Sequence, residues 1–86
     1  MKKILIYSSN ICPYCIAAKN LLATLNLSFE EKLVDDNEAI KSEMLVKSGG
    51  KKTVPQIFFG QSHIGGYDDL NKIHKTGQLM SLLNEK

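Results

Sequence analysis

The chain has 86 residues, of which 43% are hydrophobic and 23% are charged, ordinary values for a globular protein that exclude a disordered or collagen-like chain. Its formal charge is +2, and its basic residues are eleven lysines with no arginine, so nucleic-acid binding has little support. No apolar run approaches the roughly 18 residues of a membrane span, and the opening Met1–Tyr7 is too short for a secretory signal. We therefore expect one cytoplasmic domain over residues 1–86, without membrane contact.

The first part of the chain predicts a strand, a helix and a second strand. Residues 4–7 form a continuous apolar run, typical of a central strand covered on both faces. From residue 14 to Leu25, apolar side chains recur at steps of three and four, which indicates an amphipathic helix, and Pro13 suits its first position. Residues 29–34 are typical of a more polar strand at a sheet edge. This order implies a right-handed parallel crossover between the two strands.

Residues 36–64 predict a second helix followed by a β-hairpin. The helix begins at Asp36 or Asn37 and ends before Gly49–Gly50. The segments 54–59 and 62–64 are typical of two short strands, because the intervening Gly60–Gln61 is a turn signal.

The last part of the chain predicts helical structure. Gly65–Gly66 breaks the preceding strand, and Asp68–Asp69 lie in the first turn of a third helix, where acidic residues are favoured by the positive helix end. A final segment packs leucines 79, 82 and 83 inward, as part of that helix or as a separate one. The predicted order is βαβαββα, an α/β fold without linkers or repeats.

The two cysteines, Cys12 and Cys15, are the residues most indicative of chemistry. A CxxC pair near a βαβ pattern is typical of a cytosolic redox motif. A zinc site would need about four ligands, and the other candidates, His63 and His74, do not have the spacing of a histidine ligand pair. A purely structural disulfide is disfavoured because its short loop would constrain the unfolded chain little. A redox pair remains the leading interpretation.

The two cysteines are predicted to have different roles. Cys12 is expected at the N-cap of the first helix, where its sulfur faces free backbone N–H groups of Tyr14 and Cys15 and the positive helix end. Both features stabilise a thiolate, so Cys12 is the predicted nucleophile. Cys15 lies in the first turn and is partly covered, so it is predicted to attack a mixed disulfide already formed on Cys12. The alternative is that both thiols merely fill space.

Three runs of residues together resemble a known family: Cys12-Pro13-Tyr14-Cys15, Thr53-Val54-Pro55 and Gly65-Gly66-Tyr67-Asp68-Asp69-Leu70. In this order they resemble a dithiol glutaredoxin, over almost the whole chain. The resemblance implies the thioredoxin fold, a central four-stranded mixed sheet flanked by helices, with a cis peptide before Pro55. It implies a glutathione-dependent thiol–disulfide oxidoreductase that uses glutathione as co-substrate, binds no cofactor or metal, and serves electron transport and redox homeostasis in the cytoplasm.

The same resemblance implies a glutathione-binding site. The Val54 backbone would pair with the cysteinyl part of glutathione, and the start of the third helix would hold the γ-glutamyl carboxylate and ammonium, the ammonium on Asp69. Many family members have a lysine where this chain has Ser9, so Lys51 or Lys52 is expected to supply the charge for the glycine carboxylate. The predicted binding residues are Tyr14, Lys51, Lys52, Thr53, Val54, Pro55, Gly66, Tyr67, Asp68 and Asp69.

The expected partners are glutathione and proteins that carry a glutathionyl group or a disulfide, with ribonucleotide reductase as one client suggested by the resemblance. We expect a monomer. Two alternative functions stay open: a thioredoxin-like reductase charged by a flavoenzyme, and a glutaredoxin dimer that binds an iron–sulfur cluster. The paired acids after Gly65–Gly66 disfavour the first alternative, and Pro13 disfavours the second. A redox-inert interaction domain would require an unreactive Cys12.

Overall fold

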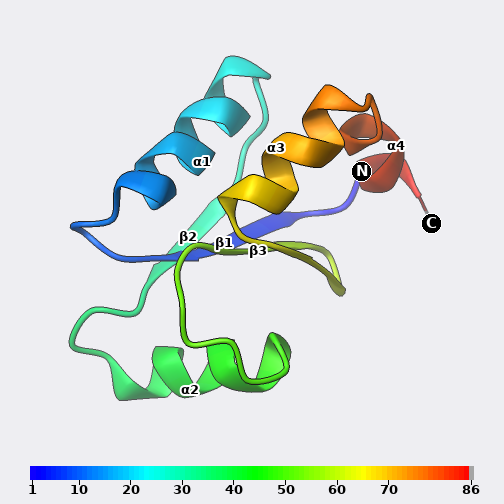
Figure 1. Cartoon of the computed structure of the whole chain (residues 1–86). Helices are drawn as coiled ribbons and strands as arrows, with labels where there is room; N and C mark the ends of the chain where they lie inside the picture. Colours follow the sequence, from blue (N-terminus) through cyan, green and yellow to red (C-terminus); the bar gives the residue numbers. More distant parts are fainter. Residues whose placement is uncertain (86) are drawn as a thin grey trace.

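The computed structural model describes residues 1–85 and contains a four-stranded mixed sheet with helices on both faces (Figure 1). In chain order the elements are β1 (Ile4–Ser8), α1 (Pro13–Thr24), β2 (Glu30–Leu33), α2 (Glu38–Lys47), β3 (Gln56–Phe59), β4 (Ser62–Gly65), α3 (Tyr67–Lys75) and α4 (Leu79–Asn84). This order confirms the predicted βαβαββα pattern, with the final helical part divided in two.

The sheet has the strand order β2-β1-β3-β4. Strand β1 pairs in parallel with β2 and antiparallel with β3, and β3 pairs antiparallel with β4. The parallel pairing of β1 with β2 is the one that the sequence predicts. The apolar β1 is therefore an interior strand, whereas the polar β2 lies at one edge of the sheet, as its composition indicates.

Two predicted strands are shorter in the structure than in the sequence analysis. The segment 29–34 is extended only over Glu30–Leu33, and Phe29 instead packs against the core. The segment 54–59 forms a strand only from Gln56, because Pro55 has no N–H to donate to a sheet ladder. The peptide bond between Val54 and Pro55 is cis, as expected from the resemblance.

The division between α3 and α4 occurs at Gly77. Thr76 and Gly77 donate their N–H groups to the carbonyls of Lys72 and His74, which closes the last turn of α3. Gly77 then has a φ of 78°, a left-handed conformation in which glycine has no steric cost. The chain turns there and begins the separate short helix α4.

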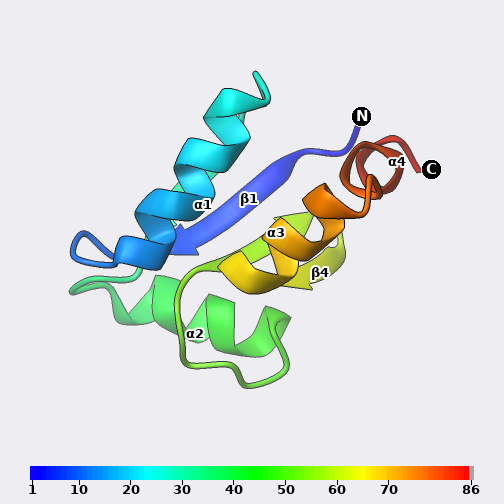
Figure 2. The ribbon, with the colours of Figure 1, turned by 45° about the horizontal axis from the view of Figure 1, so that its top comes forward.

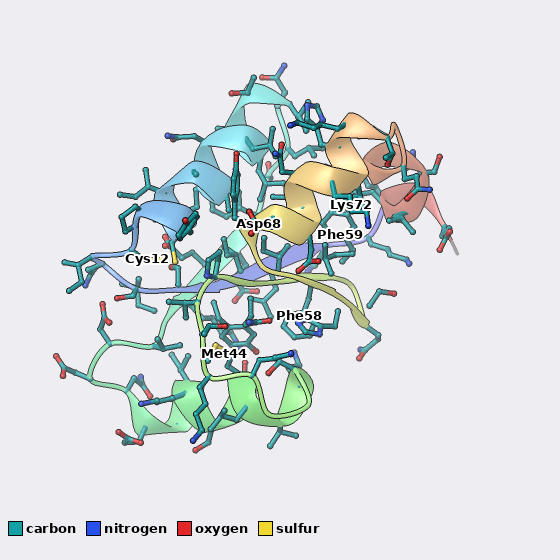
Figure 3. All side chains as sticks on the ribbon, in the orientation of Figure 1. Cys12, Met44, Phe58, Phe59, Asp68 and Lys72 are labelled. Atoms are coloured by element: carbon teal, nitrogen blue, oxygen red, sulfur yellow. The ribbon has the colours of Figure 1, made fainter. Side chains whose placement is uncertain are left out.

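The two faces of the sheet are covered by different helices. Helices α1, α3 and α4 lie on one face and α2 lies on the other (Figures 1 and 2). The first face carries the larger apolar core, which consists of Ile4, Ile6, Ala18, Leu22, Leu27, Ile57, Phe59, Leu70, Leu79 and Leu83. The α2 face carries a smaller cluster of Tyr7, Met44 and Phe58, and Figure 3 shows Met44 and Phe58 between the sheet and α2. Within residues 1–85, no helix is long and apolar enough to cross a membrane.

Candidate active site

Cys12 is the N-cap residue of α1, as predicted, and lies at the start of the helix next to the end of β1 (Figure 3). Its backbone is extended, with φ −118° and ψ 108°, and Pro13 occupies the start of the helix. The Cys15 N–H donates to the Cys12 sulfur at 3.2 Å, so Cys15, rather than Tyr14, supplies the expected backbone contact. The same sulfur lies 3.6 Å from the carbonyl oxygen of Val54. Cys12 therefore faces both α1 and the segment before β3.

Cys15 is completely buried, whereas Cys12 is half-buried. Loss of solvation on burial raises the pKa of the Cys15 thiol to about 12, and its hydrogen bond with Cys12 adds to that shift. Cys15 is therefore protonated at neutral pH, and Cys12 is the more accessible of the two thiols. The structure places the two thiols as the sequence predicts, with Cys15 more deeply buried than expected.

The loop between β1 and Cys12 is held by Asp35, a contact that the sequence analysis missed. Ser9 Oγ donates to Asp35 Oδ1 at 2.8 Å, and the Asn10 N–H donates to Asp35 Oδ2 at 2.7 Å. The Asn10 bond, and then the Ser9 bond, hold the pKa of the Asp35 carboxyl below its usual range. Ser9 occupies the position where the resemblance implies a lysine, and here its hydroxyl fixes the loop.

A cavity of about 460 Å³ lies between the starts of α1 and α3 and the segment before β3, a size typical of small-ligand sites. Every predicted binding residue except Lys52 lines it, so the structure distinguishes the two neighbouring lysines. Four further lining residues were not predicted: Gln56, His63, Ile64 and Gly65.

Two tyrosines stand at the wall of this cavity. Tyr14 comes from the first turn of α1, and Tyr67 is the first residue of α3. Their ring centroids are 6.3 Å apart, with the planes tilted by 33°. Tyr14 is 62% exposed, so its ring is accessible to solvent at the wall of the cavity.

The start of α3 forms another wall of the cavity. Asp69 Oδ2 accepts a hydrogen bond from the Gly66 N–H at 3.1 Å, so part of this carboxylate caps the helix. Gly65 has a φ of +121°, and a Cβ there would lie 2.3 Å from Asp69 Oδ2; the position therefore requires glycine. Asp68 and Asp69 are both exposed and both line the cavity. They differ in that Asp69 also accepts the Gly66 N–H.

The described part of the chain, residues 1–85, brings no group of three or more histidine, cysteine or acidic side chains together as a metal cluster. The site contains a dithiol at the start of a helix beside a mixed sheet. An accessible N-cap thiol, a buried second thiol one turn on and a small-molecule cavity beside them are the arrangement of a thiol–disulfide oxidoreductase of the thioredoxin fold.

Comparison with known proteins gives the family. The glutaredoxin family model matches residues 4–64. The chain is 46% identical over 83 residues to glutaredoxin 3 of Escherichia coli K12, covering 96% of this chain and 99% of that protein. It is 40% identical over 84 residues to a glutaredoxin of Pseudomonas aeruginosa, covering 98% of this chain and 99% of the relative. The chain belongs to the glutaredoxin family.

Solved structures agree with this assignment. The solution structure of Brucella melitensis glutaredoxin is 42% identical, with a TM-score of 0.82 over 96% of this chain and 89% of that one. A buckwheat glutaredoxin–glutathione complex is 30% identical, with a TM-score of 0.84 over 95% of this chain and 76% of that one. Glutaredoxins are glutathione-dependent thiol–disulfide oxidoreductases, and this is the activity of the present chain.

Proposed function

We propose that Cys12 performs glutathionyl transfer. Its thiolate attacks the glutathione sulfur of a protein–glutathione mixed disulfide, the original S–S bond breaks, and the protein thiolate leaves and takes up a proton. The glutathionyl group is then bound to Cys12 by a new S–S bond. A second glutathione, as thiolate, attacks this group, so that glutathione disulfide leaves and the Cys12 thiolate returns. The observation that carries this proposal is the half-buried Cys12 sulfur, which accepts the Cys15 N–H and lies 3.6 Å from the carbonyl oxygen of Val54, a residue that lines the cavity.

A second branch uses both cysteines. The Cys12 thiolate attacks one sulfur of a protein disulfide, the client S–S bond breaks, one client thiolate leaves and takes up a proton, and the other client sulfur is joined to Cys12 in a mixed disulfide. Cys15 then loses its proton and attacks the Cys12 sulfur, which releases the second client thiol and leaves a Cys12–Cys15 disulfide. Two glutathione molecules reduce this bond and leave as glutathione disulfide. The burial of Cys15 supports this order, because an external disulfide cannot reach it before Cys12.

Two single substitutions test this division of roles. Cys12→Ser is expected to abolish both branches, whereas Cys15→Ser should retain reduction of a small glutathionyl mixed disulfide and lose reduction of a protein disulfide. The first activity is measured with glutathione and coupled to glutathione reductase, and the second by release of client thiols. Loss of both activities in Cys15→Ser, with the fold intact by circular dichroism, contradicts the proposed roles.

We also propose how glutathione occupies the cavity. The Val54 backbone pairs with the cysteinyl residue, Tyr14 flanks the sulfur, and the free N–H groups at Tyr67 and Asp68 bind the γ-glutamyl carboxylate. Because Asp69 already accepts from Gly66, we assign the ammonium contact mainly to Asp68. The sequence favoured Asp69 for this contact, and substitution of each acid decides between the two. The buckwheat relative solved in complex with glutathione supports the choice of ligand.

Lys51 is the proposed partner of the glycine carboxylate, because it lines the cavity and its neighbour Lys52 does not. The two lysines are a matched pair for mutagenesis. Lys51→Ala should raise the KM for the glutathionyl substrate about threefold to tenfold, the scale of one charge-assisted contact at an exposed site, and Lys52→Ala should change it less than twofold. If both substitutions raise the KM equally, the effect comes from the positive charge of the segment in general and not from a specific contact of Lys51.

The acids at the start of α3 are a second matched pair. Asp68→Asn should raise the KM about threefold to tenfold, because a charge-assisted contact with the ammonium is lost, with little change in thermal stability. Asp69→Asn should lower thermal stability more, because it weakens the bond to Gly66 at the helix start. The reverse pattern would return the ammonium contact to Asp69.

We further propose that residues 1–86 act as one glutaredoxin domain, monomeric and cytoplasmic, on glutathionylated and disulfide-containing proteins. A CxxC redox pair of this kind is typical of a reducing compartment, which supports the location. Ribonucleotide reductase is one proposed client. Analytical ultracentrifugation tests the monomer, and covalent trapping of clients on Cys12 in the Cys15→Ser variant tests the partners, since a mixed disulfide persists when the resolving thiol is absent.

A further inference from the structure

A buried amide, that of Gln56, connects strand β4 with the segment that faces Cys12. Gln56 is the first residue of β3, directly after Pro55, and is only 4% exposed. Its Nε2 donates to the Thr53 carbonyl oxygen at 3.0 Å and lies 3.3 Å from Thr53 Oγ1. On its other side, Gln56 Oε1 lies 2.6 Å from His63 Nε2. The amide is therefore satisfied at both ends, as a buried polar group requires.

The direction of these hydrogen bonds follows from the Thr53 carbonyl, which can only accept. The Gln56 NH₂ group must therefore point to Thr53, and its Oε1 must point to His63. It follows that His63 carries a proton on Nε2 and donates it. The His63 ring thus acts as a donor toward Gln56 through Nε2.

The His63 ring is held in place by an aromatic neighbour. It stacks on Phe58, with ring centroids 4.8 Å apart and an interplanar angle of 26°. Phe58 is 3% exposed and packs with Met44 and Tyr7 on the α2 face of the sheet. The donor that orients Gln56 is thus supported by the core, although His63 itself is on the exposed edge strand.

The acceptor at the other end lies in a segment with little support of its own. Residues 51–55 form neither helix nor strand. The Thr53 carbonyl and the Val54 N–H belong to one planar trans peptide, in which the two groups point in opposite directions. When Gln56 holds the carbonyl from inside the protein, the Val54 N–H must point away from Gln56. The next carbonyl, that of Val54, lies 3.6 Å from the Cys12 sulfur.

We propose that Gln56 and His63 are a positioning pair that fixes the Thr53–Val54 peptide plane and so presents the Val54 N–H to the glutathione moiety. This inference rests on the proposed binding of glutathione to the Val54 backbone. Neither residue touches the reacting sulfurs. Their effect is expected on the binding of the glutathionyl substrate, and not on the chemistry at Cys12.

Two substitutions of His63 separate the donated proton from the ring. His63→Phe keeps an aromatic ring to stack on Phe58 but removes the donor, whereas His63→Gln removes the ring and keeps an N–H donor on a side chain of sufficient length. His63→Phe should raise the KM for a small glutathionyl mixed disulfide about threefold to tenfold, the equivalent of one hydrogen bond, with kcat changed less than twofold. His63→Gln should restore the KM to within about twofold of the wild type.

Gln56→Leu tests the other half of the pair. It should raise the KM at least as much as His63→Phe, and the double variant should be no worse than Gln56→Leu alone, because both substitutions remove the same link. If the effects of Gln56→Leu and His63→Phe on the KM add in the double variant, the two residues do not act as a pair and the proposal is overturned. If Gln56→Leu does not fold, as judged by circular dichroism, the two His63 variants decide the question. An unchanged KM in His63→Phe, or an equal rise in His63→Phe and His63→Gln, also overturns the proposal.

An NMR measurement tests separately whether glutathione binds the Val54 backbone and whether His63 and Gln56 position that backbone. The Val54 amide resonance is followed by NMR in the Cys15→Ser protein before and after glutathionylation of Cys12. A large shift supports the contact between Val54 and glutathione, and His63→Phe in the same background should reduce that shift. If glutathionylation leaves the Val54 resonance in place, the binding mode fails and the positioning role fails with it. If the shift is present but the same in His63→Phe, only the positioning role is overturned.

Discussion

The two faces of the sheet are built in different ways. The face under α1, α3 and α4 holds a cluster of ten buried apolar residues. The α2 face holds Tyr7, Met44 and Phe58, and the Tyr7 hydroxyl donates to Glu43, which also accepts from Lys32 at 2.8 Å. The comparison indicates that the first face supplies most of the stability, since apolar burial is the dominant favourable contribution to folding. The α2 face combines a smaller core with polar contacts.

Both faces contribute to the site, although in different ways. Helices α1 and α3 start at the cavity and provide Cys12 and the Tyr67–Asp69 turn. The α2 face provides Phe58, on which His63 stacks. Asp35, which holds the loop before Cys12, lies in the segment between β2 and α2. Substitutions on the first face should therefore mainly lower the free energy of unfolding, and those on the second should have smaller effects on stability.

The largest effect is expected for Phe59→Ala in the apolar core under α1, α3 and α4. Phe59 is completely buried, and truncation of a buried phenylalanine removes its transfer free energy and leaves a cavity, at a cost of about 3 to 5 kcal/mol. Urea unfolding followed by circular dichroism measures this loss. As a control, Val46→Ala at an 82% exposed position should change stability by no more than about 0.5 kcal/mol. If Phe59→Ala lowers the free energy of unfolding only slightly, this face does not supply most of the stability.

Met44→Ala tests the smaller core on the other face. Met44 is completely buried between α2 and the sheet, but its apolar cluster is smaller than the one around Phe59. We therefore expect a loss of about 2 kcal/mol in the free energy of unfolding, the lower end of the range for such truncations. Met44→Leu conserves volume and should cost less than about 1.5 kcal/mol. The same urea titration gives both values. A loss equal to that of Phe59→Ala would make the two faces equivalent.

Tyr7→Phe removes only the hydroxyl that donates to Glu43. At neutral pH the expected loss is about 1 kcal/mol, the net value of one hydrogen bond. Burial, and then the Glu43 hydrogen bond, raise the pKa of Tyr7 above its ordinary value of 10.0. The unfolded chain therefore releases this proton at lower pH than the folded protein, and stability contributed by the neutral phenol falls as pH rises above about 10. Urea midpoints from pH 7 to pH 11 should show the difference between wild type and Tyr7→Phe shrinking; a constant gap contradicts this assignment.

The smallest effect is expected for Asp35→Asn, which weakens the bonds from Asn10 and Ser9. The pKa of Asp35 is lowered in the folded protein. The ionised carboxylate therefore contributes to the free energy of unfolding at pH values above the ordinary carboxyl pKa of about 3.9, and this contribution is lost as the pH falls through the lower pKa of the folded protein. Thermal unfolding should therefore differ between wild type and Asp35→Asn at pH 6 and converge near pH 2. Asp36→Asn, at the exposed neighbouring position, is the control and should not change this profile.

The sequence was sufficient for those features that depend on near neighbours in the chain. The apolar run of β1, the spacing of apolar residues in α1 and the position of Pro13 determine where Cys12 and Cys15 lie, and the structure agrees. The βαβαββα order follows from the same kind of local pattern. The resemblance to glutaredoxins added the cis peptide before Pro55 and the cavity residues, which no periodicity specifies.

The remaining features depend on contacts between distant segments. The Ser9–Asp35 bond joins residues 26 positions apart, and no local pattern shows which acid will reach the loop. The Gln56–His63 contact depends on how β3 and β4 align, with an irregularity between Ile57 and Phe58. Lys51 lines the cavity and Lys52 does not, and no local pattern specifies this because both residues lie in a segment without helix or strand.

The burial of Cys15 gives this protein an internal probe of its own opening. Cys12 can be blocked first with an alkylating reagent at neutral pH, because it is the accessible thiol. Any slower alkylation then requires an opening motion that exposes Cys15, so its rate reports the free energy of that motion. Comparing this rate with global unfolding shows whether the first turn of α1 opens alone or only when the whole protein unfolds. The redox pair therefore also serves as a built-in gauge of local stability.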